Sequence, residues 1–235
     1  EWLKVAVCYW HSFNWPGTDI FGAGTLPRPW LGASVTQVMA EAKLDAAFDF
    51  LSRLGVPYFT FHDVDAMATA TTVKDHNDNL RRIEEAMAKK MAATGIKLLW
   101  GTANLFSHPR YAGGGATSPD PQSFAWAAAQ VRAALETTHR LAGENYVLWG
   151  GREGYDSLLN TDLRRELDQY GRFLSMVVDH KHRIGFKGTI LVEPKPFEPT
   201  KHQYDHDAAA VFAFLEKYGL TREFKLNIEG NHATL

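Results

Sequence analysis

Residues 188–196 have the sequence GTILVEPKP, in which a continuous apolar run ends at two charged side chains, Glu193 and Lys195. An apolar run without alternation is typical of a strand that is buried on both faces, as parallel strands are. Glu193 and Lys195 are two residues apart, so on a strand both side chains would point to the same face. The stretch therefore predicts a parallel strand with charged groups at its carboxyl end.

Other strand-like runs alternate with helical patterns along the chain. The predicted strands are residues 3–10, 56–63, 96–106, 145–151, 188–196 and 224–232, and the predicted helices are residues 35–54, 79–94, 123–141, 162–184 and 207–218. In the first helix we predict an apolar stripe formed by Val38, Met39, Ala42, Ala46, Phe50 and Leu54. Repeated strand–helix order is typical of stacked βα units.

Polar residues follow most of the predicted strands, among them His62, Asp65, Thr102, Glu193, Lys195, Glu229 and His232. A doubly wound sheet would usually concentrate its site at one switch point, with a Gly-rich phosphate turn. A (β/α)₈ barrel instead brings all strand ends to one mouth. We therefore predict an α/β fold, a single TIM-barrel domain over residues 1–235 that is partial. About six βα units are present, and strands seven and eight and a C-terminal extension are expected beyond the chain.

Composition and charge indicate which classes of partner to expect. The 235 residues are 45% hydrophobic and 22% charged, as in globular proteins, and no apolar run approaches the roughly 18–20 residues of a membrane span. The net charge of −2, with no basic block, gives no electrostatic footprint for nucleic acid. Cys8 is the only cysteine and no cleavable signal is evident at the start, which favours a cytoplasmic protein. We expect a small-molecule partner.

The stretch FHDVD places His62 and Asp65 three residues apart at a strand end. One interpretation is a histidine satisfied by local hydrogen bonds and an aspartate that caps the next helix. The other is an acid–base pair, in which the carboxylate fixes the tautomer and orientation of the imidazole.

A second group of polar residues suggests a metal site. Glu193 and Glu229 would supply oxygen ligands and His232 a nitrogen ligand, a set that suits a divalent ion such as Mn²⁺ or Co²⁺. Glu193 and Lys195 could alternatively be a simple structural ion pair. Three ligands are an incomplete shell, so we expect the others after Leu235. The strand-end aromatics Trp100, Phe106 and Trp149 could form flat walls that suit a sugar, or could belong to the core.

At these residues the chain resembles the xylose isomerases, in particular the longer-chain group of that family. The matching stretches are RPW (28–30), FHD (61–63), WGTANLFS (100–107), WGGREGY (149–155), EPKPFEPTKHQYD (193–205) and NHATL (231–235). The resemblance implies a (β/α)₈ barrel, usually a homotetramer, that interconverts D-xylose with D-xylulose and D-glucose with D-fructose. It also implies two divalent cations per subunit (Mg²⁺, Mn²⁺ or Co²⁺) and a metal-assisted hydride shift after the sugar ring opens.

The resemblance implies a role for each matching residue. His62 would assist ring opening with Asp65 as its orienting carboxylate, and Lys195 would donate a hydrogen bond to the sugar. Glu193 and His232 would each bind one metal, and Glu229 would bridge both. The predicted substrate contacts are Trp100, Thr102, Trp149 and Phe21, the last reaching into a neighbouring subunit.

Two other functions fit the same residues. Another divalent-metal TIM barrel, such as a sugar epimerase or an endonuclease, would also place glutamate and histidine ligands on strand ends and would use a glutamate base. A truncated, inactive barrel would only bind a sugar or a partner.

Overall fold

The computed structural model describes residues 4–233, and their contacts divide them into two compact units. Unit 1 contains residues 4–103 and 133–144, and unit 2 contains residues 104–132 and 145–233. Each unit contains three parallel strands with helices beside them. That the whole chain is one partial barrel domain stays a prediction.

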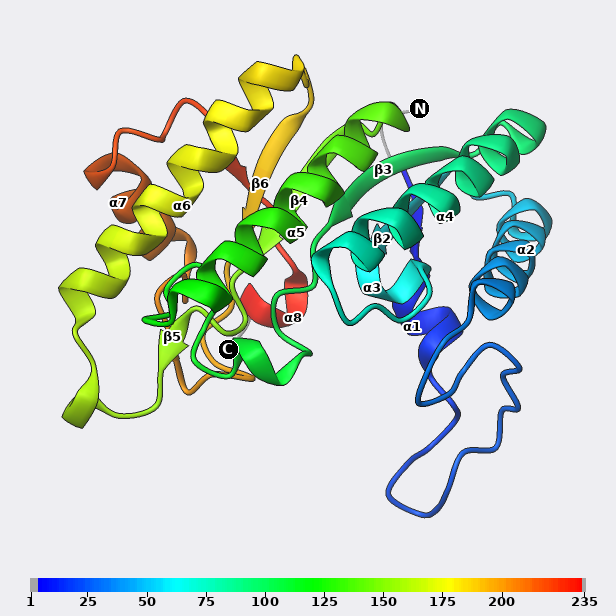
Figure 1. The fold of residues 1–235 in the computed structure, drawn as a ribbon, viewed down its shortest axis with the longest axis horizontal. Helices are drawn as coiled ribbons and strands as arrows, with labels where there is room; N and C mark the ends of the chain where they lie inside the picture. The colour runs from blue at the N-terminus through cyan, green and yellow to red at the C-terminus, as the bar shows by residue number, and fades with distance from the viewer. Residues whose placement is uncertain (1–3, 234–235) are drawn as a thin grey trace. The chain divides into compact units, whose positions relative to one another are not determined.

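Unit 1 is built on strand β2, which pairs in parallel with both β1 and β3. Figure 1 shows these strands with α2 and α4. The elements of unit 1 are β1 (Ala6–Cys8), α1 (Tyr9–Asn14), α2 (Gln37–Leu54), β2 (Tyr58–His62), α3 (Asp63–Ala66), α4 (Val73–Thr94), β3 (Lys97–Thr102) and the second part of α5 (Pro121–Arg140).

Helix α2 has clear signals at both ends. Thr36 accepts a hydrogen bond from the amide of Met39 at the amino end, and Gly55 ends the helix in the left-handed conformation, with φ at 71°. The core of unit 1 lies between α2, α4 and β2, where Leu44, Phe59 and Met87 are fully buried. Each such side chain contributes roughly 1.5–3 kcal/mol through the removal of apolar surface from water.

The prediction of which face of α2 is buried is wrong. Val38, Phe50 and Leu54 are exposed, and the structure instead buries Ala40, Lys43, Leu44, Ala47, Phe48 and Leu51. The helix carries apolar residues around most of its circumference, so two stripes have helical spacing and only tertiary packing selects one.

The first strand and the second long helix also differ from prediction. The strand predicted over residues 3–10 is β1, only Ala6–Cys8, and Leu3 lies outside the described residues. Tyr9 instead begins α1, because Tyr9 and Phe13, one helical turn apart, are both buried on the same face. Helix α4 begins at Val73 rather than Asn79, since Thr72 caps it by accepting from the amide of Asp75.

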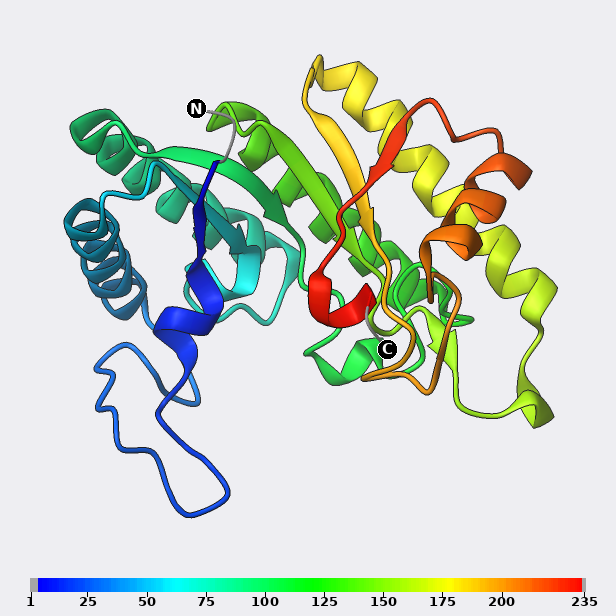
Figure 2. The ribbon, with the colours of Figure 1, turned by 180° about the vertical axis from the view of Figure 1, so that it is seen from behind.

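Unit 2 is built on strand β6, which pairs in parallel with β4 and β8. A two-residue antiparallel ribbon, β5 with β7, lies apart from that sheet. Figure 2 shows α8 directly after β8, at the end of the described chain. The elements are η1 (Pro109–Tyr111), the first part of α5, β4 (Asn145–Trp149), β5 (Gly154–Tyr155), η2 (Leu158–Asn160), α6 (Leu163–Ile184), β6 (Thr189–Glu193), β7 (His202–Gln203), α7 (Ala208–Lys217), β8 (Phe224–Leu226) and α8 (Gly230–Ala233).

A buried carboxylate shapes a loop in unit 2. Glu153 accepts hydrogen bonds from the amides of Gly115 (3.0 Å), Ala116 (2.9 Å) and Thr117 (2.8 Å), and from the Thr117 hydroxyl (2.7 Å). Four donors compensate the loss of hydration of the buried charge. This carboxylate fixes the backbone of residues 115–117, which has no regular secondary structure of its own.

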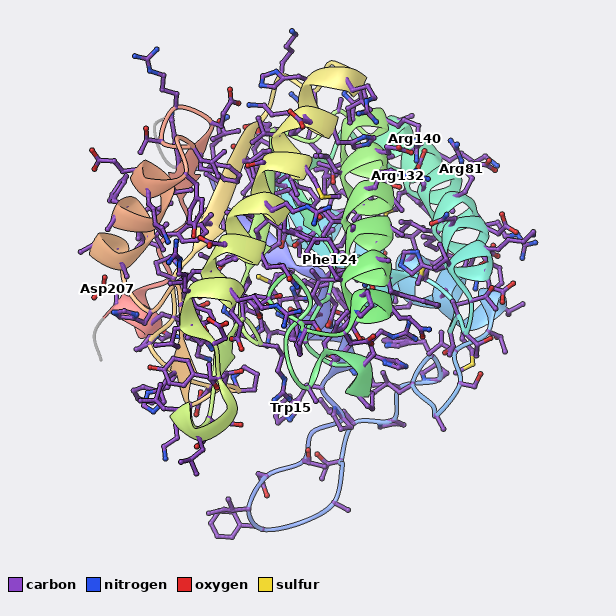
Figure 3. All side chains as sticks on the ribbon, turned by 60° about the vertical axis from the view of Figure 1, so that its left-hand side comes forward. Trp15, Arg81, Phe124, Arg132, Arg140 and Asp207 are labelled. Carbon is purple, nitrogen blue, oxygen red and sulfur yellow. The ribbon has the colours of Figure 1, made fainter. Side chains whose placement is uncertain are left out.

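The loop between α1 and α2 extends away from the rest of unit 1 (Figures 1 and 2). Trp15 lies where the chain enters this loop (Figure 3). At its tip Ile20 and Phe21 are 91% and 90% exposed. Across residues 4–233, no helix combines the length and apolar character needed to cross a lipid bilayer.

Candidate functional site

Glu193, Glu229 and His232 lie together in unit 2. Each offers one ligand atom, and these three atoms lie within 4.8 Å of one another. Glu193 is the last residue of β6, whereas Glu229 and His232 follow β8, which ends at Leu226. His232 lies in the short helix α8 and not on a strand as predicted. The turn between β8 and α8 brings the imidazole back over the end of β6.

The imidazole of His232 is the best indication that this cluster fits a metal ion. Its Nδ1 lies 3.6 Å from Glu193 Oε1 and its Nε2 lies 3.5 Å from Glu229 Oε2. Neither distance is a hydrogen bond, and the buried Nδ1 has no hydrogen-bond partner among the described residues. Burial lowers the pKa of His232, an effect that the charge of Glu229 opposes. A neutral imidazole between two carboxylates is a ligand set that divalent transition ions accept.

Two asparagines orient the carboxylates of the cluster, and the sequence interpretation missed both. Asn227 donates from its side-chain amide to Glu193 Oε2, and Asn231 donates to Glu229 Oε1 at 2.8 Å. In each case one carboxylate oxygen is held by an amide while the other lies nearest His232. Both asparagines are present in the stretch NIEGNH, but no spacing rule singled them out. Hydrogen bonds of this kind hold a ligand in place.

Lys195 lies beyond the end of β6 and not on the strand, so its predicted alternation with Glu193 does not apply. Its ammonium lies 5.4 Å from the centre of the Trp149 ring and 3.3 Å from a carboxylate oxygen of Glu198. Trp149 packs edge-on against Phe106, with ring centres 4.4 Å apart. Its buried indole Nε1 has no hydrogen-bond partner within residues 4–233.

In unit 1, His62 and Asp65 form the predicted pair. His62 ends β2, Asp65 lies in α3, and their Nδ1 and Oδ2 atoms are 2.7 Å apart. His62 is 8% exposed. The chain changes sharply from strand to helix at Asp63, and this turn places the Asp65 carboxylate beside the His62 imidazole. The local geometry therefore suits a histidine whose orientation and tautomer are fixed by a carboxylate.

Aromatic rings surround His62. Trp10 of α1 lies over it, with ring centres 4.1 Å apart, and Trp100 of β3 lies 5.5 Å from Trp10. Trp10 was not a predicted site residue, because its run was interpreted as strand. Thr102 is buried at the end of β3. Phe21 lies in the extended loop and contributes nothing to this cluster of rings. Glu153 and Lys43 are further buried polar groups, and Asn14 is partly buried.

Comparison with known proteins supports the motif assignment. The xylose isomerase of Paraburkholderia phytofirmans is 63% identical over 235 residues, which are 100% of this chain and 53% of that protein. That of Solibacter usitatus is 63% identical over 233 residues, 99% of this chain and 53% of that protein. The chain resembles xylose isomerase along its whole length. It spans about half the length of the xylose isomerases it matches. The predicted resemblance is thus confirmed, and no protein-family model matches the chain.

Solved structures support the fold class. A D-allulose 3-epimerase from Methylomonas sp. matches 98% of this chain and 63% of its own, with a TM-score of 0.63 and 14% identity. A xylose isomerase domain protein from Alicyclobacillus acidocaldarius matches 78% and 57%, with a TM-score of 0.52 and 12% identity. At such low identity these likenesses concern the fold alone. Together with the alternating βα units they confirm the predicted α/β barrel class.

Proposed function

We propose that the protein containing this chain is an aldose–ketose isomerase that interconverts D-xylose with D-xylulose and D-glucose with D-fructose. The observation that carries the proposal is the cluster of Glu193, Glu229 and His232. It lies in a chain that is 60–63% identical to proteins named xylose isomerase. A metal-assisted sugar isomerase that opens the sugar ring requires both a cation site and an acid–base group, and the chain supplies candidates for both.

Two divalent cations, Mg²⁺, Mn²⁺ or Co²⁺, are part of the proposal. Glu193 would hold one, His232 the other, and Glu229 both. When bound, such ions supply Lewis-acid polarisation of the sugar oxygens. The orphaned Nδ1 of His232 and the amide-oriented carboxylates are what support this assignment.

His62 would open the sugar ring. Opening a hemiacetal requires removal of the proton from the anomeric hydroxyl and addition of a proton to the ring oxygen. Asp65 accepts a hydrogen bond at Oδ2 from His62 Nδ1, which leaves the lone pair on Nε2. Nε2 could then take the hydroxyl proton and return it to the ring oxygen, so that no net proton is consumed.

The remaining predicted residues would hold the substrate. Lys195 would donate to a sugar oxygen, and the rings of Trp149 and Trp100 would contact the C–H faces of the sugar. Thr102 would contribute a hydroxyl. The buried Nε1 of Trp149 supports a polar ligand near that ring.

A homotetramer completes the proposal. Phe21 and Ile20 are almost fully exposed at the tip of the extended loop, and large apolar groups of this kind are typical of contact sites. Phe21 would reach the site of another subunit. A reducing cytoplasmic location is consistent with Cys8 as the only cysteine.

The test is turnover of D-xylose in D₂O by the full-length protein with Mg²⁺ or Mn²⁺. We expect D-xylulose with little deuterium at the carbon that receives the transferred hydrogen. With a ketose such as D-allulose as the substrate, a C3 epimer that carries solvent deuterium would favour the second candidate, a sugar 3-epimerase. That candidate comes from the fold likeness to proteins named D-allulose and L-ribulose 3-epimerase. No turnover of either kind, in a protein that binds Mn²⁺, would reject both.

A further inference from the structure

A buried lysine lies behind the His62–Asp65 pair. Lys43 is on α2 and only 4% exposed, although lysine is almost never fully buried without partners. Its ammonium donates to Asn14 Oδ1 and to the main-chain carbonyl of Asp65, and it lies 4.7 Å from the centre of the Tyr9 ring. All of these contacts lie within unit 1.

The contacts of Lys43 fix the orientation of an amide. An ammonium group can only donate, so the atom of Asn14 that faces Lys43 must be the oxygen. The amide nitrogen of Asn14 then faces the other way, and it donates to Asp65 Oδ1 at 2.7 Å. Rotating this amide by half a turn would set its NH₂ against the ammonium and its oxygen against the carboxylate.

The direction of hydrogen-bond donation that Lys43 sets continues through Asp65 to His62. With Oδ1 of Asp65 held by Asn14, Oδ2 is the oxygen that lies 2.7 Å from His62 Nδ1. Asp65 thus accepts at both oxygens, and the proton of a neutral imidazole is placed on Nδ1. We propose that Lys43 is a positioning residue that sets the tautomer of His62 through Asn14 and Asp65.

The charge on Lys43 is compatible with this role. Burial lowers the pKa of Lys43 to about 8, and the charge of Asp65 opposes that lowering. At pH 7 the ammonium form therefore predominates. The consequence for ring opening rests on the proposed function of His62, whereas the effect on its tautomer rests only on the contacts in unit 1.

The alternative is that Lys43 only fills space on the buried face of α2, beside Ala40, Leu44 and Ala47 of the same helix. Methionine has a similar length and no donor, so Lys43→Met keeps the packing and removes the polar chain. Asn14→Leu removes the next link while Lys43 keeps its contact with the Asp65 carbonyl. Lys90→Met is the matched control, because Lys90 pairs with Asp45 at 2.6 Å and touches neither Asn14 nor Asp65.

The experiment uses the full-length protein with ¹⁵N-labelled histidine rings, and the His62 signals are assigned by their loss in His62→Gln. In the unaltered protein at pH 7 we expect the hydrogen on Nδ1. Lys43→Met and Asn14→Leu should give a mixed or reversed tautomer and lower kcat for cyclic xylose about tenfold at nearly unchanged KM. Lys90→Met should change neither.

The outcomes separate a positioning role of Lys43 from a purely space-filling one. If folded Lys43→Met and Asn14→Leu both keep the hydrogen on Nδ1, the positioning role is overturned. If Lys43→Met fails to fold, Asn14→Leu alone decides in the same way. If the unaltered protein does not turn over xylose but the tautomer shifts as expected, the proposed function fails and the positioning role stands.

Discussion

Glu193 Oε1 and His232 Nδ1 lie 3.6 Å apart, too far for a hydrogen bond but within one cluster of possible metal ligands. The two residues come from different βα units, and Asn227 and α8 hold them in place. Glu229 lies on the other side of the imidazole, 3.5 Å from Nε2.

Glu229→Gln should abolish xylose turnover at any metal concentration, because it removes a charge from both proposed cation sites. His232→Asn removes a neutral ligand from one site, so excess Co²⁺ or Mn²⁺ should restore part of the activity. Atomic emission measures the bound metal alongside turnover. Glu223→Gln is the control, since Glu223 pairs with Lys181 and His182 instead. A Glu229→Gln protein that keeps two tightly bound ions would refute the bridging role.

His62→Gln should slow turnover of cyclic xylose by about 100-fold or more, because general acid–base catalysis of ring opening is lost. A short aldose that cannot form a ring should be turned over nearly as well as by the unaltered protein. The measurement compares kcat/KM for the two sugars. His182→Gln, an exposed histidine paired with Glu223, should affect neither. Equal losses for both sugars would show that His62 acts after ring opening.

Phe21→Ser should weaken subunit assembly and raise KM, because the exposed ring is proposed to contact another subunit. Light scattering over a range of protein concentrations measures the assembly. Leu159→Ser is a matched control, since Leu159 is also almost fully exposed but lies in η2 of unit 2. If the assembly state and the kinetics of Phe21→Ser are unchanged, the loop has another role.

Asp205→Asn should stabilise the protein at pH 8 and much less at pH 5. Burial raises the pKa of Asp205 to about 7, although the Tyr170 hydroxyl donates to it at 3.2 Å. Between pH 4 and 7 the folded state holds a proton that the unfolded state has lost, so stability falls as pH rises towards 7. Above pH 7 the full penalty, on the order of 4 kcal/mol, is present, and asparagine removes it.

Melting temperatures at the two pH values, without added metal, test this effect of Asp205. Asp179→Asn, at an exposed position of α6, provides the comparison. An equal gain at pH 5 and pH 8 would mean that titration of Asp205 does not contribute.

The sequence predicted the helices better than the faces that they bury. Gly55, Gly95 and Gly185 end α2, α4 and α6 in the left-handed conformation, and glycine directly after a helical pattern is a signal that a sequence can carry. The buried stripe of α2 was wrong, because apolar residues surround that helix. The stripe that is buried contains Lys43, and a lysine between Ala40 and Leu44 was the available signal for a buried cation.

The site was predicted in part. The motifs named His62, Asp65, Glu193, Glu229 and His232, and the structure brings the first two together and the last three together. The sequence could not name Asn14, because its contact with α3 depends on α1, whose first two residues were predicted as strand and whose remaining residues were not predicted as helix. Asn227 was missed because an asparagine becomes a ligand support only through its neighbours in space.

The Glu153 carboxylate affects when the loop of residues 115–117 can fold during synthesis of the chain. The amides of residues 115–117 and the Thr117 hydroxyl find their acceptor only in a side chain that follows them in the sequence, after β4. During synthesis this segment leaves the ribosome before Glu153 does, so it remains hydrated and without its final shape until β4 has emerged. A stalled chain that ends before Glu153 should therefore be cut by proteases between Asn104 and Asp120, whereas one that includes Glu153 can close the loop.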